Sequence, residues 1–88
     1  MYVYEEHRAF IFTEDGQVLF LRVRDRIAKL LATSGAFDLH SAVSGISGGN
    51  DWQKIACVDR LVELKELHEI KNPYSSAGQD RIFIKVGR

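Results

Sequence analysis

Apolar side chains recur over residues 14–34 at spacings of three, four and seven, which is the pattern of an amphipathic helix. Thr13 precedes this segment as a candidate N-cap, and Gly35 follows it where helices commonly end. The alternative is a hairpin, because Asp15-Gly16 is a typical two-residue turn. The periodicity favours the helix, whose apolar stripe consists of Leu19, Phe20, Val23, Ile27, Leu30 and Leu31.

The first thirteen residues are rich in aromatic and β-branched side chains, which are typical of strands. We therefore expect residues 1–13 to form an N-terminal arm that contains a short strand over Ala9–Phe12.

The middle of the chain alternates between helix signals and turn signals. Asp38 can cap a short helix over residues 38–46, and a Ser-Gly-Gly turn follows it. Asn50 and Gln53 have the spacing of a capping box, so a longer helix is expected over residues 51–67. The apolar positions expected to face the core are Ile55, Val58, Leu61, Val62 and Leu64.

Two short apolar runs near the end of the chain predict a pair of strands. They cover residues 68–71 and 81–86, and each is rich in β-branched or aromatic side chains. The polar residues 72–79 between them have the composition of a loop. We therefore expect a β-hairpin over residues 68–86.

The run DRLVELKELHEI, at residues 59–70, resembles the end of the recognition helix and the start of the wing in winged helix-turn-helix proteins. Together with the preceding helix and turn, the resemblance covers residues 24–86. It implies an α+β, mainly α fold: a three-helix winged helix-turn-helix with a C-terminal β-hairpin wing and a short N-terminal strand or extension. One such domain would span residues 1–88. The sequence departs from the family at Lys65, where many winged helices have glycine.

The resemblance also implies a DNA-binding surface on the third helix and the wing. On the third helix, the resemblance implies that base edges and phosphates are contacted by Asn50, Gln53, Lys54, Cys57 and Arg60. The wing residues it implies are Lys71, Tyr74, Ser75, Ser76, Gln79, Arg81 and Lys85. The wing is basic, whereas the third helix is mildly acidic. A typical recognition helix would show the reverse.

Composition weakens the expectation of strong DNA binding. The 88 residues contain 12 Lys and Arg against 12 Asp and Glu, so no overall basic excess attracts nucleic acid. The single cysteine, Cys57, rules out an internal disulfide and suits a reducing compartment. The chain shows neither a signal peptide pattern nor an apolar stretch of membrane-spanning length, so we expect a cytoplasmic protein without membrane contact.

No motif in the sequence points to catalysis. His7, His40 and His68 are scattered, and Cys57 has no cysteine or histidine near it at a zinc-ligand spacing. The GISGG segment at residues 45–49 lacks the lysine and the preceding strand of a phosphate-binding loop. We therefore expect no enzyme activity, no metal site and no cofactor.

Two functions remain open at this stage. The first is a small protein that binds double-stranded DNA as a homodimer and regulates transcription. Its dimer interface would consist of Tyr2, Tyr4, Phe10, Phe12, Val18 and Leu21. The second is a protein-interaction winged helix that serves as a non-catalytic accessory or inhibitory factor. Zero net charge and the acidic third helix favour the second, whereas the basic wing and the helix-turn-helix order favour the first. We expect the first, with the second as the alternative.

Overall fold

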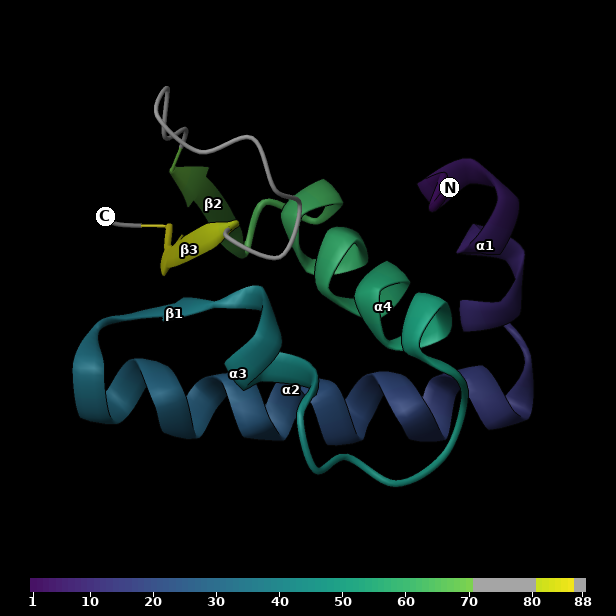
Figure 1. Cartoon of the computed structure of the whole chain (residues 1–88), viewed down its shortest axis with the longest axis horizontal. Coiled ribbons are helices and arrows are strands. Elements are labelled where there is room, and N and C mark those ends of the chain that lie inside the picture. Colours follow the sequence, from purple (N-terminus) through teal and green to yellow (C-terminus); the bar gives the residue numbers. More distant parts are fainter. Residues whose placement is uncertain (71–80, 87–88) are drawn as a thin grey trace.

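Residues 1–70 and 81–86, which the computed structural model describes, form four helices and a three-stranded antiparallel sheet (Figure 1). The helices are α1 (Tyr4–Ile11), α2 (Glu14–Ser34), α3 (Leu39–Val43) and α4 (Asp51–Glu63). The strands are β1 (Ala36–Asp38), β2 (Leu67–Ile70) and β3 (Ile82–Lys85). Helix α2 runs along the length of the molecule, with α1, α4 and the sheet on one side of it (Figure 1). The expected α+β, mainly helical class is confirmed.

Helix α2 confirms the helical interpretation of residues 14–34, and the hairpin alternative is wrong. The Thr13 hydroxyl accepts a hydrogen bond from the Gly16 backbone N–H at 3.0 Å, so Thr13 caps the helix as expected. Gly35 follows the last turn in the left-handed conformation, at φ 76°, and its N–H donates to the Leu31 carbonyl. The residues that α2 buries are Gly16, Leu19, Val23 and Ile27.

The expected strand over Ala9–Phe12 is wrong, because most of that segment lies in helix α1. Tyr4 and Ile11 are seven residues apart, so they lie on the same side of this helix, which faces α4 and α2. Glu5 and Glu6 occupy the first turn, where negative charge interacts favourably with the helix dipole. Burial of one helical side outweighs the strand propensity of the aromatic residues.

Gly16 allows α1 to approach the start of α2 closely. A β-carbon at this position would lie 1.9 Å from the Phe10 carbonyl oxygen and 2.8 Å from the Ile11 Cα. Both neighbours are backbone atoms, so neither can rotate away to make room. Glycine costs about 1 kcal/mol of helix propensity relative to alanine, but only glycine fits where the two helices meet.

Strand β1 was not predicted from the sequence. It forms one edge of a sheet with the order β1-β3-β2, in which all neighbours are antiparallel. Phe37 of β1 lies opposite Phe83 of β3, and the centroids of their stacked rings are 5.3 Å apart. Phe83 is fully buried, so the aromatic pair joins the segment after α2 to the C-terminal hairpin.

Helices α3 and α4 begin at the expected caps. The Asp38 carboxylate accepts a hydrogen bond from the Ser41 backbone N–H at 3.3 Å. Asn50 and Gln53 exchange hydrogen bonds at 2.8 and 3.0 Å, which is the expected capping box. Helix α3 ends at Val43, earlier than expected, because the next residue is extended.

Helix α4 ends at Glu63, before the expected end at residue 67. Lys65 adopts the left-handed conformation at φ 62°. Its N–H donates to the Val62 carbonyl, and the Glu66 N–H donates to the Leu61 carbonyl, which is the Schellman pattern of helix termination. Lys65 therefore occupies a position that usually favours glycine, and the chain turns directly into β2.

The close approach at Gly16 generates a stability prediction. We expect Gly16→Ala to lower the free energy of unfolding by about 2 kcal/mol or more, because α1 must move away from α2. Gly45→Ala is the control, since Gly45 also disfavours alanine, at φ 76°, but has no atom within 4 Å of the added carbon. The control should lose about 1 kcal/mol. Equal losses in urea titrations followed by circular dichroism would contradict the packing role of Gly16.

Candidate functional site

Helix α4, expected to be the recognition helix, is enclosed by its neighbours over much of its circumference. Contacts reach it from α1, α2, α3 and β2. Its fully buried residues are Ala56, Cys57, Val58 and Leu61. At 100° per residue, these positions span about 200° of the helix circumference. The remaining sector carries three acidic residues, Asp51, Asp59 and Glu63.

Cys57 lies in the core, so the expectation that it contacts DNA bases is wrong. Burial raises the pKa of its thiol to about 11, which keeps the sulfur protonated at neutral pH. Gln53, Lys54 and Arg60, expected on the same DNA-facing side, are each only partly exposed. The error has a physical cause. Helix α1 was not expected, and the junction of α1 with α2 covers this side of α4.

The side-chain oxygens of Asn50 and Gln53 are committed to the cap of α4. Each accepts a hydrogen bond from the other residue's backbone N–H. A base contact through either oxygen would compete with these hydrogen bonds. A typical N-cap contributes about 1 kcal/mol to the stability of its helix. The predicted phosphate and adenine contacts at these two positions would therefore weaken the start of the helix.

Glu63 is the centre of a polar cluster at the end of α4. Its carboxylate accepts hydrogen bonds from Arg60 at 2.7 Å, Tyr4 at 2.8 Å and Arg8 at 3.1 Å. Both guanidinium groups also lie 5.0 Å from the centroid of the Phe12 ring. The hydrogen bonds from Arg60, Tyr4 and Arg8 lower the pKa of Glu63 to about 2. Burial and the bond to Glu63 raise the pKa of Tyr4 to about 12.

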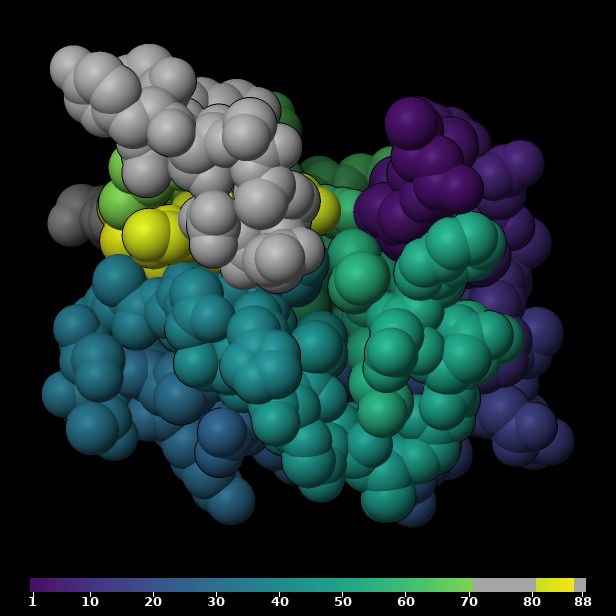
Figure 2. All heavy atoms as spheres, in the orientation of Figure 1, coloured from purple at the N-terminus to yellow at the C-terminus, as the bar shows by residue number. Residues whose placement is uncertain are grey.

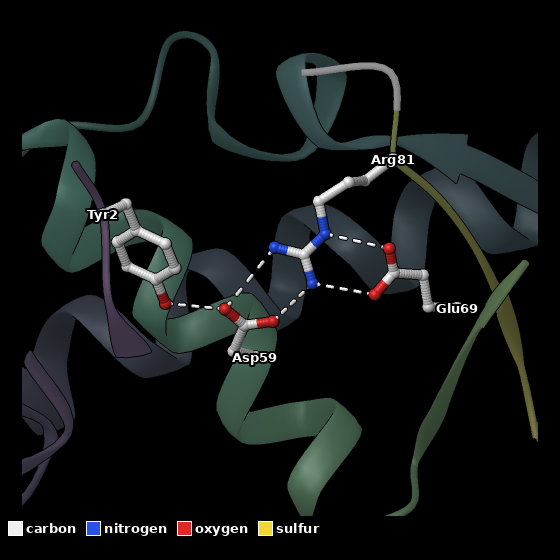
Figure 3. Close-up of polar contacts among 4 residues, drawn as sticks. All are labelled: Tyr2, Asp59, Glu69 and Arg81. Carbon is white, nitrogen blue, oxygen red and sulfur yellow. Dashed lines mark hydrogen bonds and ion pairs between the residues drawn. The ribbon is translucent and has the colours of Figure 1, made fainter. Parts of the chain in front are cut away.

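Arg81 is the centre of a second cluster, which ties the hairpin to α4 (Figure 3). Its guanidinium donates two hydrogen bonds to Glu69, at 3.0 and 2.9 Å, and two to Asp59, at 2.6 and 3.5 Å. The Tyr2 hydroxyl also donates to Asp59, at 2.6 Å. Burial disfavours the charge of Arg81, but its hydrogen bonds to the two carboxylates outweigh burial and raise its pKa. Burial and the bond to Asp59 raise the pKa of Tyr2.

Arg81 was predicted to contact DNA phosphates, but the structure engages it in this cluster. Its side chain is only 23% exposed, and its charge faces the carboxylates of Asp59 and Glu69. A phosphate would have to displace one of these carboxylates to reach the guanidinium. Arg81 therefore has a structural role, since it joins α4 to both strands of the hairpin.

The N-terminal segment also lies against the first turns of α4 (Figure 2). The His7 ring stacks on Tyr2, at a centroid distance of 5.8 Å, and meets the Trp52 ring edge-on at 5.2 Å. These contacts cover part of the sector of α4 that a DNA groove would have to approach. Trp52 itself remains 44% exposed.

The other predicted site residues are distributed over several surfaces. Lys85 is exposed at the end of β3. The predicted wing residues that lie outside the described part of the chain are Lys71, Tyr74, Ser75, Ser76 and Gln79. Three of the residues predicted at a dimer interface, Tyr2, Tyr4 and Phe10, are partly buried against the chain's own core. The exposed members of that set are Phe12, Val18 and Leu21.

Two hollows between α2 and the end of α4 were not predicted from the sequence. The first, of about 450 Å³, is lined by Ile11, Phe12, Gln17, Phe20, Arg60 and Leu64. The second, of about 530 Å³, is lined by Arg24, Ile27, Ala28, Leu31, Ala32, Leu61, Lys65, Glu66, Leu67, Lys85 and Val86. Small exposed residues on α2, Ala28 and Ala32, are the sequence signal that could have indicated a groove.

Comparison of the chain with models of protein families, with curated protein sequences and with solved structures finds no match. Within the described residues, no cluster of three or more histidine, cysteine or acidic side chains has the arrangement of a metal site. None of the helices in the same part of the chain combines the length and the apolar character needed to cross a bilayer.

The structural role of Arg81 predicts a stability change. We expect Arg81→Met to lower the free energy of unfolding by about 2 kcal/mol, because the partly buried Asp59 and Glu69 would lose their hydrogen bonds from Arg81. Lys85→Met is the matched control on the exposed end of β3 and should change it by about 0.5 kcal/mol or less. Chemical denaturation measures both variants. A loss no larger than that of the control would contradict the anchoring role.

The lowered pKa of Glu63 predicts an acid-dependent loss of stability. Because the pKa falls from 4.5 to about 2 on folding, the ionised carboxylate stabilises the protein fully above pH 4.5. That contribution disappears as the pH falls towards 2. Glu63→Gln should therefore show a smaller decrease in unfolding free energy over this interval than the parent protein. Parallel pH dependences in urea titrations would show that Glu63 makes no such contribution.

Proposed function

We propose that this chain is a winged-helix protein-interaction domain that acts as a non-catalytic accessory factor. The order α2, α3, glycine-containing turn, α4 and β2–β3 hairpin supports the winged-helix assignment, with α1 as an additional N-terminal helix. Winged helices are scaffolds whose function depends on the surface they present, so the assignment alone does not favour DNA over protein.

The observation that carries the proposal is the engagement of the cations on α4 and at the base of the hairpin. Arg60 is bound to Glu63, and Arg81 is bound to Asp59 and Glu69. A DNA-reading surface needs guanidinium groups that are available to bases and phosphates. Here Asp59 and Glu63 on the outward sector of α4 pair with these same guanidinium groups, so this sector presents no available guanidinium to a phosphate backbone.

DNA binding as a homodimer remains the second candidate. The helix-turn-helix order favours it, and Lys85 is exposed on the hairpin where a phosphate contact would be made. On this alternative, Arg60→Ala would weaken binding to a specific operator, and Lys85→Ala would weaken binding to any duplex. Both effects require that the parent protein binds DNA measurably.

Duplex affinity at low salt decides between the two candidates. For the protein-interaction domain, we expect the affinity for a labelled random-sequence duplex to be weaker than about 100 µM, because its net charge is zero and Arg60 and Arg81 are paired with carboxylates. Fluorescence anisotropy at two salt concentrations measures the affinity and its salt dependence.

A micromolar affinity that falls steeply with salt would overturn the proposal and establish DNA binding, since each neutralised phosphate adds about −0.9 to the logarithmic salt slope. The Lys85→Ala variant then identifies whether the hairpin makes the contact. An unchanged anisotropy across the titration supports the protein-interaction domain.

A further inference from the structure

We propose that α2 and the end of α4 form a groove between them that binds an acidic amphipathic helix of a partner protein. This inference rests on the proposed protein-interaction function and names the surface and the partner chemistry. We call this surface the α2 groove. It consists of the two hollows described above, one lined by Phe20 and Leu64 among others and the other by Ala28 and Val86 among others.

The two hollows follow one another along α2. Gln17 and Phe20 line the first, and α2 residues 24–32 line the second. The two hollows also share a wall opposite α2, just after the end of α4. There Leu64 lines the first hollow, and the next residue, Lys65, lines the second. Residues 17–32 of a helix extend over about 24 Å, which matches four turns of a bound helix.

The floor of the α2 groove is apolar and accessible. Phe12 is 52% exposed and Leu64 is 42% exposed at one end, and Val86 is 38% exposed at the other. Between them, Ala28 and Ala32 leave room because their side chains are small. Apolar side chains spaced at three and four residues on a partner helix fit such a floor.

The charged residues of the α2 groove are mainly basic although the chain is neutral overall. The lining holds four cationic residues, namely Arg24, Arg60, Lys65 and Lys85, and one acidic residue, Glu66. Because Arg60 is bound to Glu63, the positive excess rests chiefly on Lys65 and Lys85. Arg24 pairs with Glu66 at 3.4 Å, but both side chains are about half exposed, so solvent screens this pair. The excess of positive charge is complementary to acidic residues along the flanks of a bound helix.

The same charges disfavour a second copy of this chain as the occupant. A symmetric contact between two α2 grooves would bring Arg24, Lys65 and Lys85 close to their own counterparts. Like charges placed together in this way oppose association. An acidic helix from a different protein avoids this repulsion.

A synthetic amphipathic helix provides the probe. It has about 16 residues, leucines at helical spacing and glutamates on both flanks, and a matched peptide carries lysine in place of each glutamate. We expect the glutamate peptide to bind at least about tenfold more tightly than the lysine peptide, because only the former complements the rim. Fluorescence anisotropy measures the affinities, and amide chemical shifts in the nuclear magnetic resonance spectrum locate the contact.

A pair of alanine variants tests the location. Ala28→Glu introduces bulk and negative charge into the α2 groove and should weaken the binding of the glutamate peptide by about tenfold or more. Ala9→Glu makes the same change at an exposed position of α1, outside the groove, and should leave the affinity unchanged. Thermal unfolding of both variants confirms that each remains folded.

Equal affinities for the two peptides, no binding of either, or shifts confined to the acidic sector of α4 would overturn the groove assignment. Self-association that Ala28→Glu abolishes would overturn it in favour of a second copy. Failure of the groove is distinct from failure of the proposed function. Only duplex binding contradicts the proposed function, and a groove that binds no peptide leaves a protein-interaction domain with another contact surface.

Discussion

Burial of α4 on several sides is the constraint on which the arrangement of the other elements depends. Because Ala56, Cys57, Val58 and Leu61 face different directions, no single neighbour can cover them, and α1, α2, α3 and the sheet must all pack around one short helix. Gly16 permits the sharp joining of α1 to α2 that this packing requires. The helix that a winged-helix sequence pattern assigns to DNA is thus the central helix of the core.

Two acidic side chains of α4 are bound to the N-terminal segment and to the hairpin. Glu63 binds Arg8 and Tyr4 of the N-terminal segment, and Asp59 binds Tyr2 and the hairpin residue Arg81. Partly buried charges of opposite sign stabilise one another only when the geometry also satisfies their hydrogen bonds, and both clusters meet this condition. The same bonds that hold the two ends of the chain against α4 reduce its capacity to bind a polyanion.

The hollows between α2 and the end of α4 differ in character, since their lining is mainly apolar and carries more basic than acidic residues. Charge is therefore distributed unevenly over the surface of a protein whose net charge is zero. Net charge bears on non-specific binding to nucleic acid, whereas the local distribution determines which protein surface is complementary. This difference is why a neutral domain can carry a basic groove on one side and an acidic helical sector on another.

The sequence by itself determined the local features: the extent of α2, the caps at Thr13, Asp38 and Asn50, and the hairpin strands. These depend on residues within about four positions of one another, so periodicity and capping chemistry reveal them. Tertiary structure decided the helical state of the N-terminal segment, the strand β1 and the burial of Cys57. It also decided the pairing of Arg81 with Asp59, because these residues are separated by 22 positions and only the packed fold brings them together. Local rules carry no information on such distant pairs, and the charge of each surface depends on them.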